Sequence, residues 1–296
     1  MKDKYDYIIV GSGVAGNVCA FELQKKGYSC LIVEKNNNRC EKICGGGIPY
    51  KALHRLQEIG MNLDALYDKD VACIGGDIIH SDGKQVETVY DSGRNALGCR
   101  RVDFDTFLFS EAQKLGADIY WGVNVNKIDC SKNGYMIDKF YSRKVVIAAG
   151  ARGLENKYYK GQSIGVSTQI VGESTYPSDR FTYFYLSDTA DKYFWIFPVG
   201  KNIWNIGLWS MVPEQSMRET FSRCWNRYIE PAFRAYNVLQ SPRAEFCGNV
   251  AVNIIESIAC DAIGDYAGTN NIKNGGGIYK AIKSAISYAT MQQIKE

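Results

Sequence analysis

Residues 5–35 read YDYIIVGSGVAGNVCAFELQKKGYSCLIVEK, and this stretch decides the fold. It predicts a strand that ends at Val10, a glycine-rich turn, a helix that ends near Lys26 and a second strand that ends at Glu34. The turn carries three glycines in the G-x-G-x-x-G spacing, at Gly11, Gly13 and Gly16. Because an acidic residue follows about twenty positions later, the pattern predicts a dinucleotide-binding βαβ unit.

Each glycine of this turn has a physical role in such a unit. Gly11 permits the tight turn, Gly13 lets the backbone approach a pyrophosphate, and Gly16 allows the helix to pack closely. The helix N-terminus attracts phosphate charge. We expect Glu34 to accept a hydrogen bond from a ribose hydroxyl, with Lys35 beside it as a further cofactor residue. An acid at this place suits FAD or NAD and repels a 2′-phosphate.

A second glycine-rich segment, IGDYAGTNNIKNGGGIYKAIKSAISYA, occupies residues 263–289. A glycine triplet precedes a helix whose apolar residues recur with helical spacing, at Ile278, Ile282, Ala285 and Ala289. We expect the helix N-terminus to face the flavin end of the cofactor. The candidate cofactor residues here are Asp265, which has an alternative role as a helix N-cap, and Gly275, Gly276 and Gly277. Two glycine motifs at opposite ends of the sequence favour FAD.

A third glycine-rich segment, CEKICGGGIP at residues 40–49, places Cys44 before three consecutive glycines. Glycine loses more conformational freedom on folding than any other residue, so the run indicates either positive φ angles or a ligand close to the backbone. An ordinary loop is the alternative. A free thiol has a pKa of about 8.5, which a helix N-terminus or a cation lowers, and Pro49 is suited to begin a helix.

Composition excludes several classes of protein. The chain has 296 residues, 46% of them hydrophobic and 23% charged, with a net charge of +3, so neither nucleic-acid binding nor a disordered chain is expected. The start, MKDKYDYIIVG, enters a strand directly, and no apolar run is long enough to span a membrane, which predicts a cytoplasmic protein. Ten scattered cysteines indicate free thiols, and two histidines without a C-x-x-C pair argue against a zinc site.

The middle of the chain predicts an antiparallel sheet. Aromatic and β-branched runs occupy residues 180–187, 193–200 and 202–210. Residues 217–236 then predict an amphipathic helix, with core packing as its expected role and a membrane surface as the alternative. The fold class is therefore α/β, with a Rossmann-like FAD-binding domain (1–50, 95–152 and 245–296) interleaved with an antiparallel-sheet substrate domain (51–94 and 153–244).

Taken together, the motifs resemble the geranylgeranyl reductase family of FAD-dependent oxidoreductases, which is related in fold to the aromatic hydroxylases. The resemblance rests on the βαβ unit, on CGGGIP at 44–49, on R-x-x-F-D-x-x-L at 101–108, on GDYAG followed by GGGIYKAIKSA, and on Y-x-W-x-F-P at 193–198. The sequence departs from the family pattern in two places. AAGARG (148–153) stands where related hydroxylases have an Asp-Gly pair, and the sequence does not include the C-terminal region that many members add.

The resemblance implies a role for each matching position. The first glycine motif and Glu34 hold the ADP half of FAD, Arg101 lies by the phosphate–ribityl region, and Asp265 binds ribitol or pyrophosphate. The glycines Gly45, Gly46 and Gly47 approach the isoalloxazine ring. Cys44 is implied as a redox-active or proton-relaying thiol, and Tyr193 and Trp195 as substrate-site residues.

Rival roles remain for two of these residues. Arg101 has the alternative of a surface salt bridge with Asp103 or Asp105. Cys44 has the alternatives of a small residue packed under the flavin and of a resting disulfide with Cys40 or Cys247.

The implied reaction is flavin-dependent reduction of carbon–carbon double bonds in an apolar, polyprenyl-type substrate, with hydride from reduced FAD and a proton from a nearby acid. The implied partners are a small apolar substrate and an electron donor that no sequence motif identifies, with contact to a membrane surface as a further expectation. A flavin monooxygenase or halogenase is the alternative, and a non-catalytic flavoprotein is the third candidate.

Overall fold

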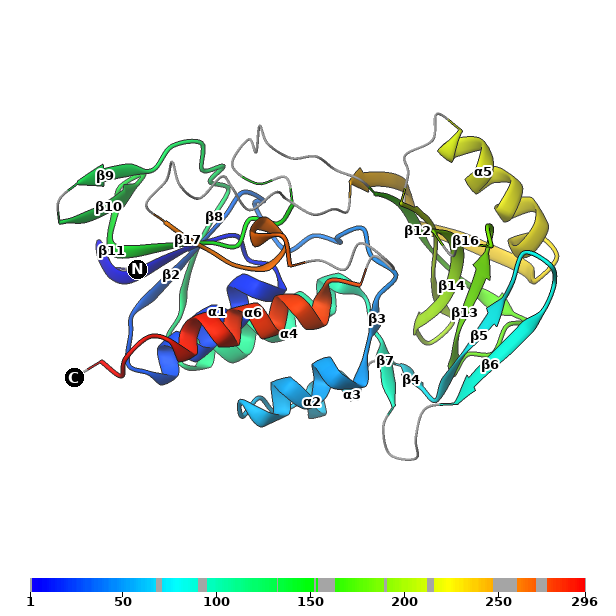
Figure 1. The fold of residues 1–296 in the computed structure, drawn as a ribbon, viewed down its shortest axis with the longest axis horizontal. Coiled ribbons are helices and arrows are strands. Elements are labelled where there is room, and N and C mark those ends of the chain that lie inside the picture. The colour runs from blue at the N-terminus through cyan, green and yellow to red at the C-terminus, as the bar shows by residue number, and fades with distance from the viewer. Residues whose placement is uncertain are drawn as a thin grey trace.

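The computed structural model describes residues 2–67, 71–89, 95–131, 133–151, 153, 163–188, 191–211, 216–246, 260–269 and 276–295. Two large sheets lie at opposite ends of the molecule, one with helices packed on it and one strongly twisted (Figure 1). A small three-stranded sheet lies between them. This arrangement confirms the mixed α/β fold class.

The N-terminal sheet contains the predicted βαβ unit. Its strands follow the order β8 (Asp118–Trp121), β2 (Cys30–Glu34), β1 (Lys4–Val10), β11 (Phe140–Ile147), β10 (Gly134–Ile137) and β9 (Asp129–Ser131), and β17 (Asp261–Ala262) pairs with β11. β1 pairs in parallel with both β2 and β11, as a dinucleotide-binding sheet requires. Helix α1 (Val14–Lys25) connects β1 to β2, and it ends one residue before the predicted end.

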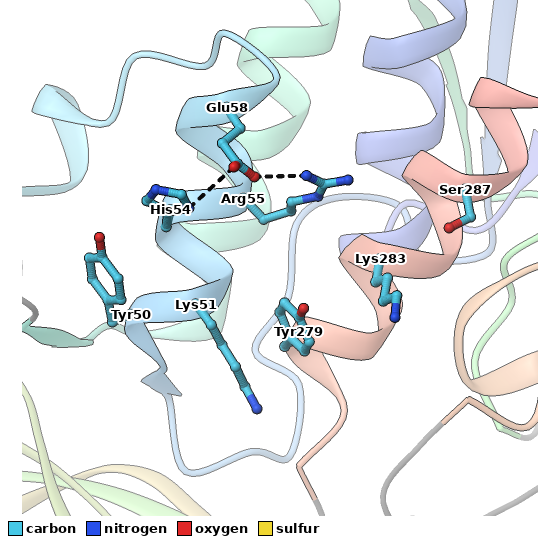
Figure 2. A pocket seen from close by; sticks show the side chains of 8 residues that line it. All are labelled: Tyr50, Lys51, His54, Arg55, Glu58, Tyr279, Lys283 and Ser287. Atoms are coloured by element: carbon cyan, nitrogen blue, oxygen red, sulfur yellow. Dashed lines mark hydrogen bonds and ion pairs between the residues drawn. The ribbon is translucent and has the colours of Figure 1, made fainter.

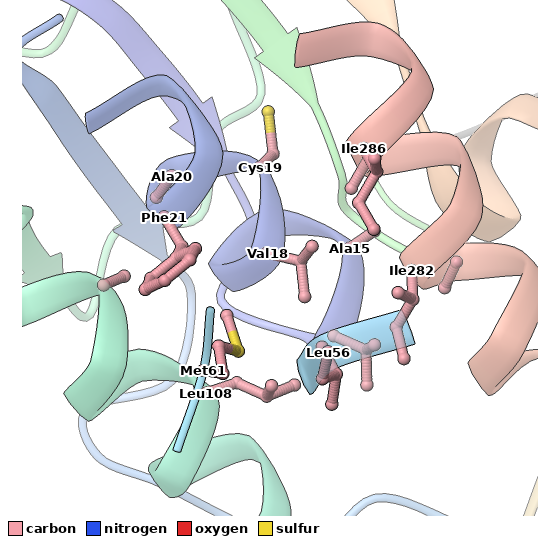
Figure 3. Packing of buried hydrophobic residues seen from close by; sticks show 14 of the residues in the cluster. Ala15, Val18, Cys19, Ala20, Phe21, Leu56, Met61, Leu108, Ile282 and Ile286 are labelled. Carbon is pink, nitrogen blue, oxygen red and sulfur yellow. The ribbon is translucent and has the colours of Figure 1, made fainter. Parts of the chain in front are cut away.

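Three helices cover one face of this sheet. α1 packs between α4 (Arg101–Lys114) and α6 (Ile278–Thr290), and all three contribute to one hydrophobic core (Figure 3). The predicted apolar face of α6 is confirmed at Ile282, Ala285 and Ala289, which are fully buried, while Ile278 is half-buried against the same core.

Gly11 and Gly16 are required at the turn between β1 and α1. Gly11 has a φ of +106°, and a Cβ there would lie 2.6 Å from the Ala148 carbonyl oxygen. A Cβ at Gly16 would overlap the Gly11 carbonyl oxygen. A larger residue at either position therefore forces the first turn of α1 away from the strands, which explains these two positions of the motif by packing alone.

The second sheet follows the order β16 (Phe233–Phe246), β12 (Ile164–Ser174), β15 (Ile203–Ser210), β14 (Lys192–Gly200), β13 (Arg180–Tyr185), β5 (Gly75–Ile79) and β6 (Gln85–Val89). The three predicted aromatic strands are β13, β14 and β15, paired antiparallel. Only the β13–β5 pairing in this sheet is parallel among the described strands. One face is covered by α5 (Met217–Cys224) and a π-helical turn, Trp225–Ile229.

The helix predicted over residues 217–236 is wrong in its second half. The helical segment ends at Ile229, and Phe233 begins the edge strand β16, which pairs with β12 along its whole length. Pro231 lacks a backbone N–H, so it cannot donate the hydrogen bond that would continue the helix, and its ring clashes with the preceding helical turn. Pairing with β12 then supplies backbone hydrogen bonds that a continued helix would lose.

The small sheet joins β3 (Gly47–Ile48), β7 (Ala96–Gly98) and β4 (Val71–Cys73). It is accompanied by α2 (Tyr50–Glu58) and the short α3 (Asp64–Tyr67). α2 falls in the range expected for the substrate domain, yet its buried Ala52, Leu53 and Leu56 pack into the core of α1 and α6. The range 51–94 is thus shared: α2 packs with the N-terminal sheet's helices, while β5 and β6 join the second sheet.

Within the described part of the chain, no helix is long and apolar enough to cross a membrane. The same residues contain no group of three or more His, Cys, Asp or Glu side chains placed to bind a metal ion.

Candidate functional site

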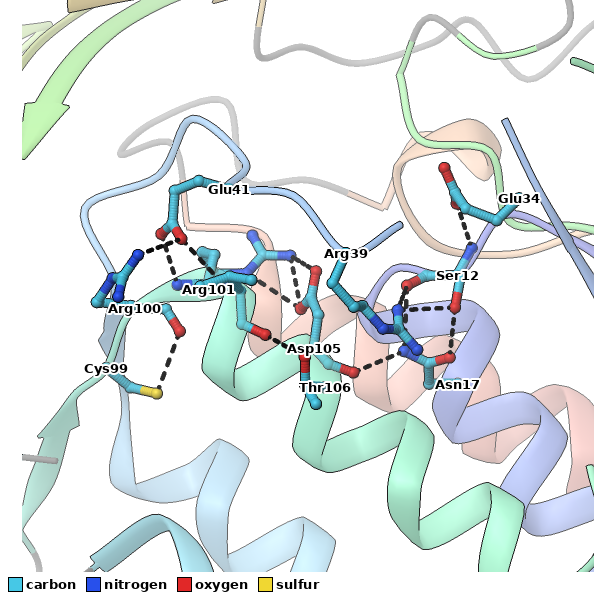
Figure 4. A network of polar contacts seen from close by, with 11 residues as sticks. Ser12, Asn17, Glu34, Arg39, Glu41, Cys99, Arg100, Arg101, Asp105 and Thr106 are labelled. Atoms are coloured by element: carbon cyan, nitrogen blue, oxygen red, sulfur yellow. Dashed lines mark hydrogen bonds and ion pairs between the residues drawn. The ribbon is translucent and has the colours of Figure 1, made fainter. Parts of the chain in front are cut away.

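Glu34 closes the glycine turn from the end of β2. Its carboxylate accepts a hydrogen bond from the Ser12 backbone N–H at 2.8 Å (Figure 4). It also accepts one from the side chain of Asn36 at 2.6 Å. Asn17, on α1, donates to the carbonyl oxygens of Ser12 and Asp105, which ties the turn to α4. Glu34 is therefore held at the end of β2, while the adjacent Lys35 is exposed.

Arg39 is a functional candidate that the sequence reasoning missed. Its Nη1 donates to the carbonyl oxygen and to the hydroxyl of Ser12, both at 2.8 Å. The guanidinium lies 4.6 Å from the ring centre of Phe109 and 5.0 Å from that of Trp121. Burial lowers the pKa of this guanidinium, although nearby carboxylates, first Asp105, oppose the shift. Buried Nε and Nη2 have no hydrogen-bond partner among the described residues.

Asp265 lies on the short 3₁₀ turn Gly264–Ala267, which packs against the first turn of α1, so that a Cβ at Gly264 would lie 2.8 Å from the Ala15 Cβ. Its Oδ1 is buried and has no partner in the described part of the chain, and neither does the hydroxyl of Thr269. Gly276 and Gly277 directly precede α6, with Gly277 at the N-cap position. Gly275 lies outside the described residues.

These features fit FAD. Gly13 has open space where a Cβ would be, and α1 begins there without a side-chain cap, so its first amides are available to a pyrophosphate. A buried polar atom without a partner is costly, and here both unpaired donors (Arg39) and unpaired acceptors (Asp265) lie near the glycine turn. A ligand that brings phosphate oxygens and hydroxyl groups satisfies both kinds.

Cys44 contacts a buried cation. The Cys44 side chain lies beside the Arg101 guanidinium, which is itself held by Asp105. Burial acts to lower the pKa of Arg101, but Asp105 and Cys44 outweigh it and raise that pKa, so the guanidinium stays charged. Lys42, in the same loop, lies near Asp265, whose carboxylate raises the lysine pKa against the effect of burial. The loop of residues 40–46 (the thiol loop) therefore lies within electrostatic range of the second glycine motif.

The partner of Arg101 is Asp105, and the pair is internal. Arg101 Nη2 donates to both carboxylate oxygens, at 3.0 and 2.9 Å, and Arg101 is only 4% exposed. The salt bridge with Asp105 that was expected as the alternative is therefore present, but the pair is buried and does not lie on the surface. Asp103 instead faces Arg100, at 4.0 Å.

Glu41 fixes the thiol loop to helix α4 and to the second sheet, and it too was missed by sequence reasoning. Its carboxylate accepts from the backbone N–H groups of Arg101 and Val102 at the start of α4 (Figure 4). It also accepts from Gln169 on β12 at 2.7 Å, while Arg243 on β16 donates to its carbonyl oxygen. No local pattern marks this residue, because all its partners are distant in the sequence.

The glycine triplet after Cys44 lies against the aromatic strand β14. A Cβ at Gly45 would lie 2.6 Å from Phe197 and 3.3 Å from the indole nitrogen of Trp195. Gly46 has a φ of +76°, and its Cβ would lie 2.5 Å from the Cys99 carbonyl oxygen. Gly47 begins β3. Protein packing thus accounts for the first two glycines, by contact and by a positive φ.

The two aromatic residues of the predicted substrate motif lie on the same face of β14. Trp195 is 5% exposed, and its indole N–H donates to Asn205 at 2.8 Å. Tyr193 is half-buried, with its ring centre 5.3 Å from that of Trp209 and 6.0 Å from that of Trp195. Cys44, Gly45 and Trp195 are therefore neighbours, which brings the thiol loop to this aromatic face.

The cysteines of the thiol loop are free. Cys40 is exposed and Cys44 is half-buried, and neither forms a disulfide in the structure. Cys247, the other expected partner of Cys44, lies outside the described residues. All nine described cysteines are free thiols.

Comparison with known proteins bears on the fold and on the expected cofactor. The family model for the FAD binding domain matches residues 4–136. A digeranylgeranylglycerophospholipid reductase from Methanococcoides burtonii is 26% identical over 304 residues, covering 95% of this chain and 73% of the relative.

Two solved structures share the fold. A geranylgeranyl bacteriochlorophyll reductase-like protein from Thermoplasma acidophilum has a TM-score of 0.78 at 20% identity, covering 97% of this chain and 77% of that one. The flavin-dependent brominase Bmp2 has a TM-score of 0.75 at 18% identity, covering 99% and 81%. The expected cofactor is thereby confirmed: the chain is an FAD-dependent oxidoreductase that is similar in sequence and in fold to proteins named as geranylgeranyl reductases.

Proposed function

We propose that the protein reduces carbon–carbon double bonds in an apolar, polyprenyl-type substrate and that Cys44 supplies the proton. The observation that carries this proposal is that Cys44 lies beside the Arg101 guanidinium and directly precedes Gly45, which packs against Phe197 and Trp195 of β14. The relative from Methanococcoides burtonii, named as a reductase of a geranylgeranyl lipid, supports the same substrate class.

The residues proposed to hold FAD form two groups. Glu34 and Arg39 bind the ADP half: Glu34 accepts from ribose, and Arg39 donates through its two buried, unpaired nitrogens. Asp265 and the amides before α6 bind the ribityl and flavin part. When bound and reduced, FAD supplies a hydride to one carbon of the double bond.

Cys44 is proposed to protonate the other carbon. Loss of its proton leaves a thiolate, and a neighbouring cation is the arrangement that stabilises a thiolate. Arg101 provides that cation, and Asp105 fixes its orientation through a two-point contact. A proton from solvent then restores the thiol, so that hydride and proton together account for the two hydrogens added.

Orientation contributes more to this reaction than the aromatic rings do. A cationic centre on the substrate gains about 0.5–2 kcal/mol from each aromatic face, so Tyr193 and Trp195 supply only a small part of the barrier lowering. Holding the double bond in line with the hydride donor and the thiol is worth about 7–11 kcal/mol. We therefore assign the aromatic face of β14 chiefly to positioning the apolar chain.

We further propose a cytoplasmic protein that meets a membrane surface to collect its apolar substrate and receives electrons from a separate donor. The test of the reaction uses dithionite-reduced holoenzyme without oxygen, incubated with a panel of isoprenoid lipids and quinones. A mass gain of about two daltons per double bond is expected, since hydride plus proton adds two hydrogens.

A second candidate function is oxygen-dependent hydroxylation or halogenation, because the fold is shared with a flavin-dependent brominase. The same substrate panel separates the two. Product that forms only when oxygen is admitted, and that carries an added oxygen or halogen atom, would establish the second candidate and reject the reductase.

A further inference from the structure

A hollow of about 390 Å³ lies between α2 and α6, on the surface of the FAD-binding part (Figure 2). Its volume is within the range of about 300–1,000 Å³ that is usual for small-molecule sites. Residues one helical turn apart on each helix line it: Tyr50, Lys51, His54, Arg55 and Glu58 from α2, and Tyr279, Lys283 and Ser287 from α6. None of these residues belongs to the FAD site described above.

The charge of this hollow is positive and incompletely neutralised. Glu58 is its one carboxylate, and it is engaged by Arg55 at 2.8 Å and faces His54 at 3.6 Å. The hydrogen bond from Arg55 lowers the pKa of Glu58, so the carboxylate stays ionised. Among the described residues, neither Lys51 nor Lys283 forms an ion pair. The lining therefore carries a net charge of +2 with His54 neutral.

The ends of the helices add to this positive potential. Lys51 Nζ lies 4.7 Å from the ring centre of Tyr279, so the first turns of α2 and α6 are side by side, and Figure 2 shows both helices running in the same direction. Neither helix has an acidic residue in its first turn or a side-chain cap. Among the described residues, the N-terminal dipole of α2 is thus uncompensated at the Lys51 end of the hollow, whereas that of α6 is assigned to the flavin.

The polar lining lies outside the hydrophobic core that α2 and α6 share. The hydrophobic contact between the two helices is made by Leu53 and Leu56 with Ile282 and Ile286, which belong to one core. Lys283 and Ser287 lie on the adjoining, exposed face of α6.

We propose that this hollow binds a phosphate ester, with Lys51 and Lys283 as the principal ligands. A phosphate group offers several acceptor oxygens and up to two negative charges, which match the uncompensated ammonium groups, and the hydroxyls of Tyr279 and Ser287 are further donors. The remaining volume accommodates the organic part of the ester. A soluble phosphate ester and the headgroup of an anionic lipid share this chemistry. The proposal goes beyond the reaction above and does not depend on it.

The test uses FAD-saturated protein, so that the cofactor's own phosphate site is filled. Binding of inorganic phosphate is measured by equilibrium dialysis, and binding to phosphatidylglycerol and phosphatidylcholine vesicles by co-sedimentation. The variant is Lys51→Gln/Lys283→Gln, and the control is Lys280→Gln, which removes an exposed lysine of the same helix that does not line the hollow. Glu58→Gln adds to the net positive charge without touching either lysine.

The wild type is expected to bind phosphate or phosphatidylglycerol, and the double variant to bind about tenfold more weakly, as for two partly exposed ion contacts. Lys280→Gln should stay within about twofold, and Glu58→Gln should bind more tightly. Binding to phosphatidylglycerol and not phosphatidylcholine identifies a lipid headgroup, whereas binding of soluble phosphate alone identifies a free ester. The proposal is overturned if the wild type binds neither probe, or if Lys280→Gln weakens binding as much as the double variant.

Discussion

Arg101 and Asp105, four residues apart on α4, form a buried two-point ion pair that directs the guanidinium at the Cys44 side chain. The pair links three segments: the thiol loop, the start of α4 and, through the Asp105 carbonyl oxygen that accepts from Asn17, the first helix of the nucleotide-binding unit. A change at this pair should therefore affect both stability and the chemistry of the thiol.

Asp105→Asn should destabilise the protein by about 3–5 kcal/mol, because it leaves the buried Arg101 charge without its partner. Urea unfolding, followed by circular dichroism, measures the change. Asp103→Asn is the matched control on the same helix, because Asp103 is exposed and its ion pair with Arg100 is long, at 4.0 Å. This variant should lower the free energy of unfolding by less than about 1 kcal/mol. Equal costs for the two variants would contradict the structural importance of the buried pair.

Cys44→Ser should reduce turnover by about 10²-fold or more, as expected when an acid–base group is lost. The visible flavin spectrum and the FAD content should stay close to those of the wild type, because the thiol is assigned to the substrate. Single-turnover oxidation of the reduced flavin by substrate measures the step directly. Cys40→Ser, which removes an exposed thiol from the same loop, should have a much smaller effect. If Cys44→Ser reacted at the wild-type rate across the pH range, the thiol would not be the proton donor.

Arg39→Gln should weaken binding of FAD and of ADP by the same factor, about tenfold, since a hydrogen bond from a charged donor is worth about 1.5–3 kcal/mol. Binding of FMN, which lacks the adenosine half, should not change. Fluorescence titration of the apoprotein with FAD and FMN, and competition by ADP, give the three constants. Arg218→Gln, on the exposed side of α5, is the control. An equal loss of affinity for FMN would show that Arg39 does not bind the ADP half of FAD.

The elements that the sequence predicts well are those with a local signal. The G-x-G-x-x-G turn and the alternation in the three aromatic strands depend on neighbouring residues, so β1, α1, β14 and β15 were predictable from the sequence alone. The end of the helix at Ile229 was also marked locally, by Pro231. The apolar spacing of Phe221, Trp225 and Tyr228, which lies wholly before that proline, nevertheless favoured too long a helix. A proline outweighs such spacing because it removes a hydrogen bond.

The site residues without a local signal were not predictable. Glu41 and Arg39 are single polar residues in a loop, and their partners Gln169, Phe109 and Trp121 come from distant segments. Likewise, the contact between Cys44 and Arg101 arises only because β3 and β7 pair beside the start of α4. Sequence reasoning gave the motif members, and the tertiary arrangement decides which of them touch.

Stability should depend on pH through Asp6. Burial alone would raise the pKa of this carboxyl, but hydrogen bonds from Lys295 at 2.6 Å and from Ser29 outweigh it and hold the pKa below its ordinary value. The folded state therefore binds the proton less readily than the unfolded chain, so this contribution is present at neutral pH and is lost as the pH falls below about 4.

Urea unfolding of the wild type and of Asp6→Asn from pH 7 to pH 3 measures this contribution. The variant should be less stable at pH 7, and the difference should shrink toward pH 3, where the wild-type carboxyl becomes protonated. Asp3→Asn removes a nearby exposed carboxylate and should show little difference at any pH. If the difference in free energy of unfolding between wild type and Asp6→Asn did not vary with pH, packing and not charge would be its origin.

The glycines after Cys44 should respond differently to substitution, although they are neighbours. Gly45→Ala should cost about 1–3 kcal/mol by overpacking, because the new methyl group meets the Phe197 ring. Phe197→Leu should recover part of that cost, since the obstacle is a side chain. Gly46→Ala has no such remedy: its φ is +76° and its methyl group meets the backbone oxygen of Cys99. Trimming Val199 to Ala, the side chain nearest to Gly46, should therefore leave Gly46→Ala as unstable as before. Urea unfolding of the two double-mutant cycles measures the coupling energies of Gly45 with Phe197 and of Gly46 with Val199. If stability recovered as much for Gly46→Ala as for Gly45→Ala, side-chain packing alone would explain why this loop needs its glycines.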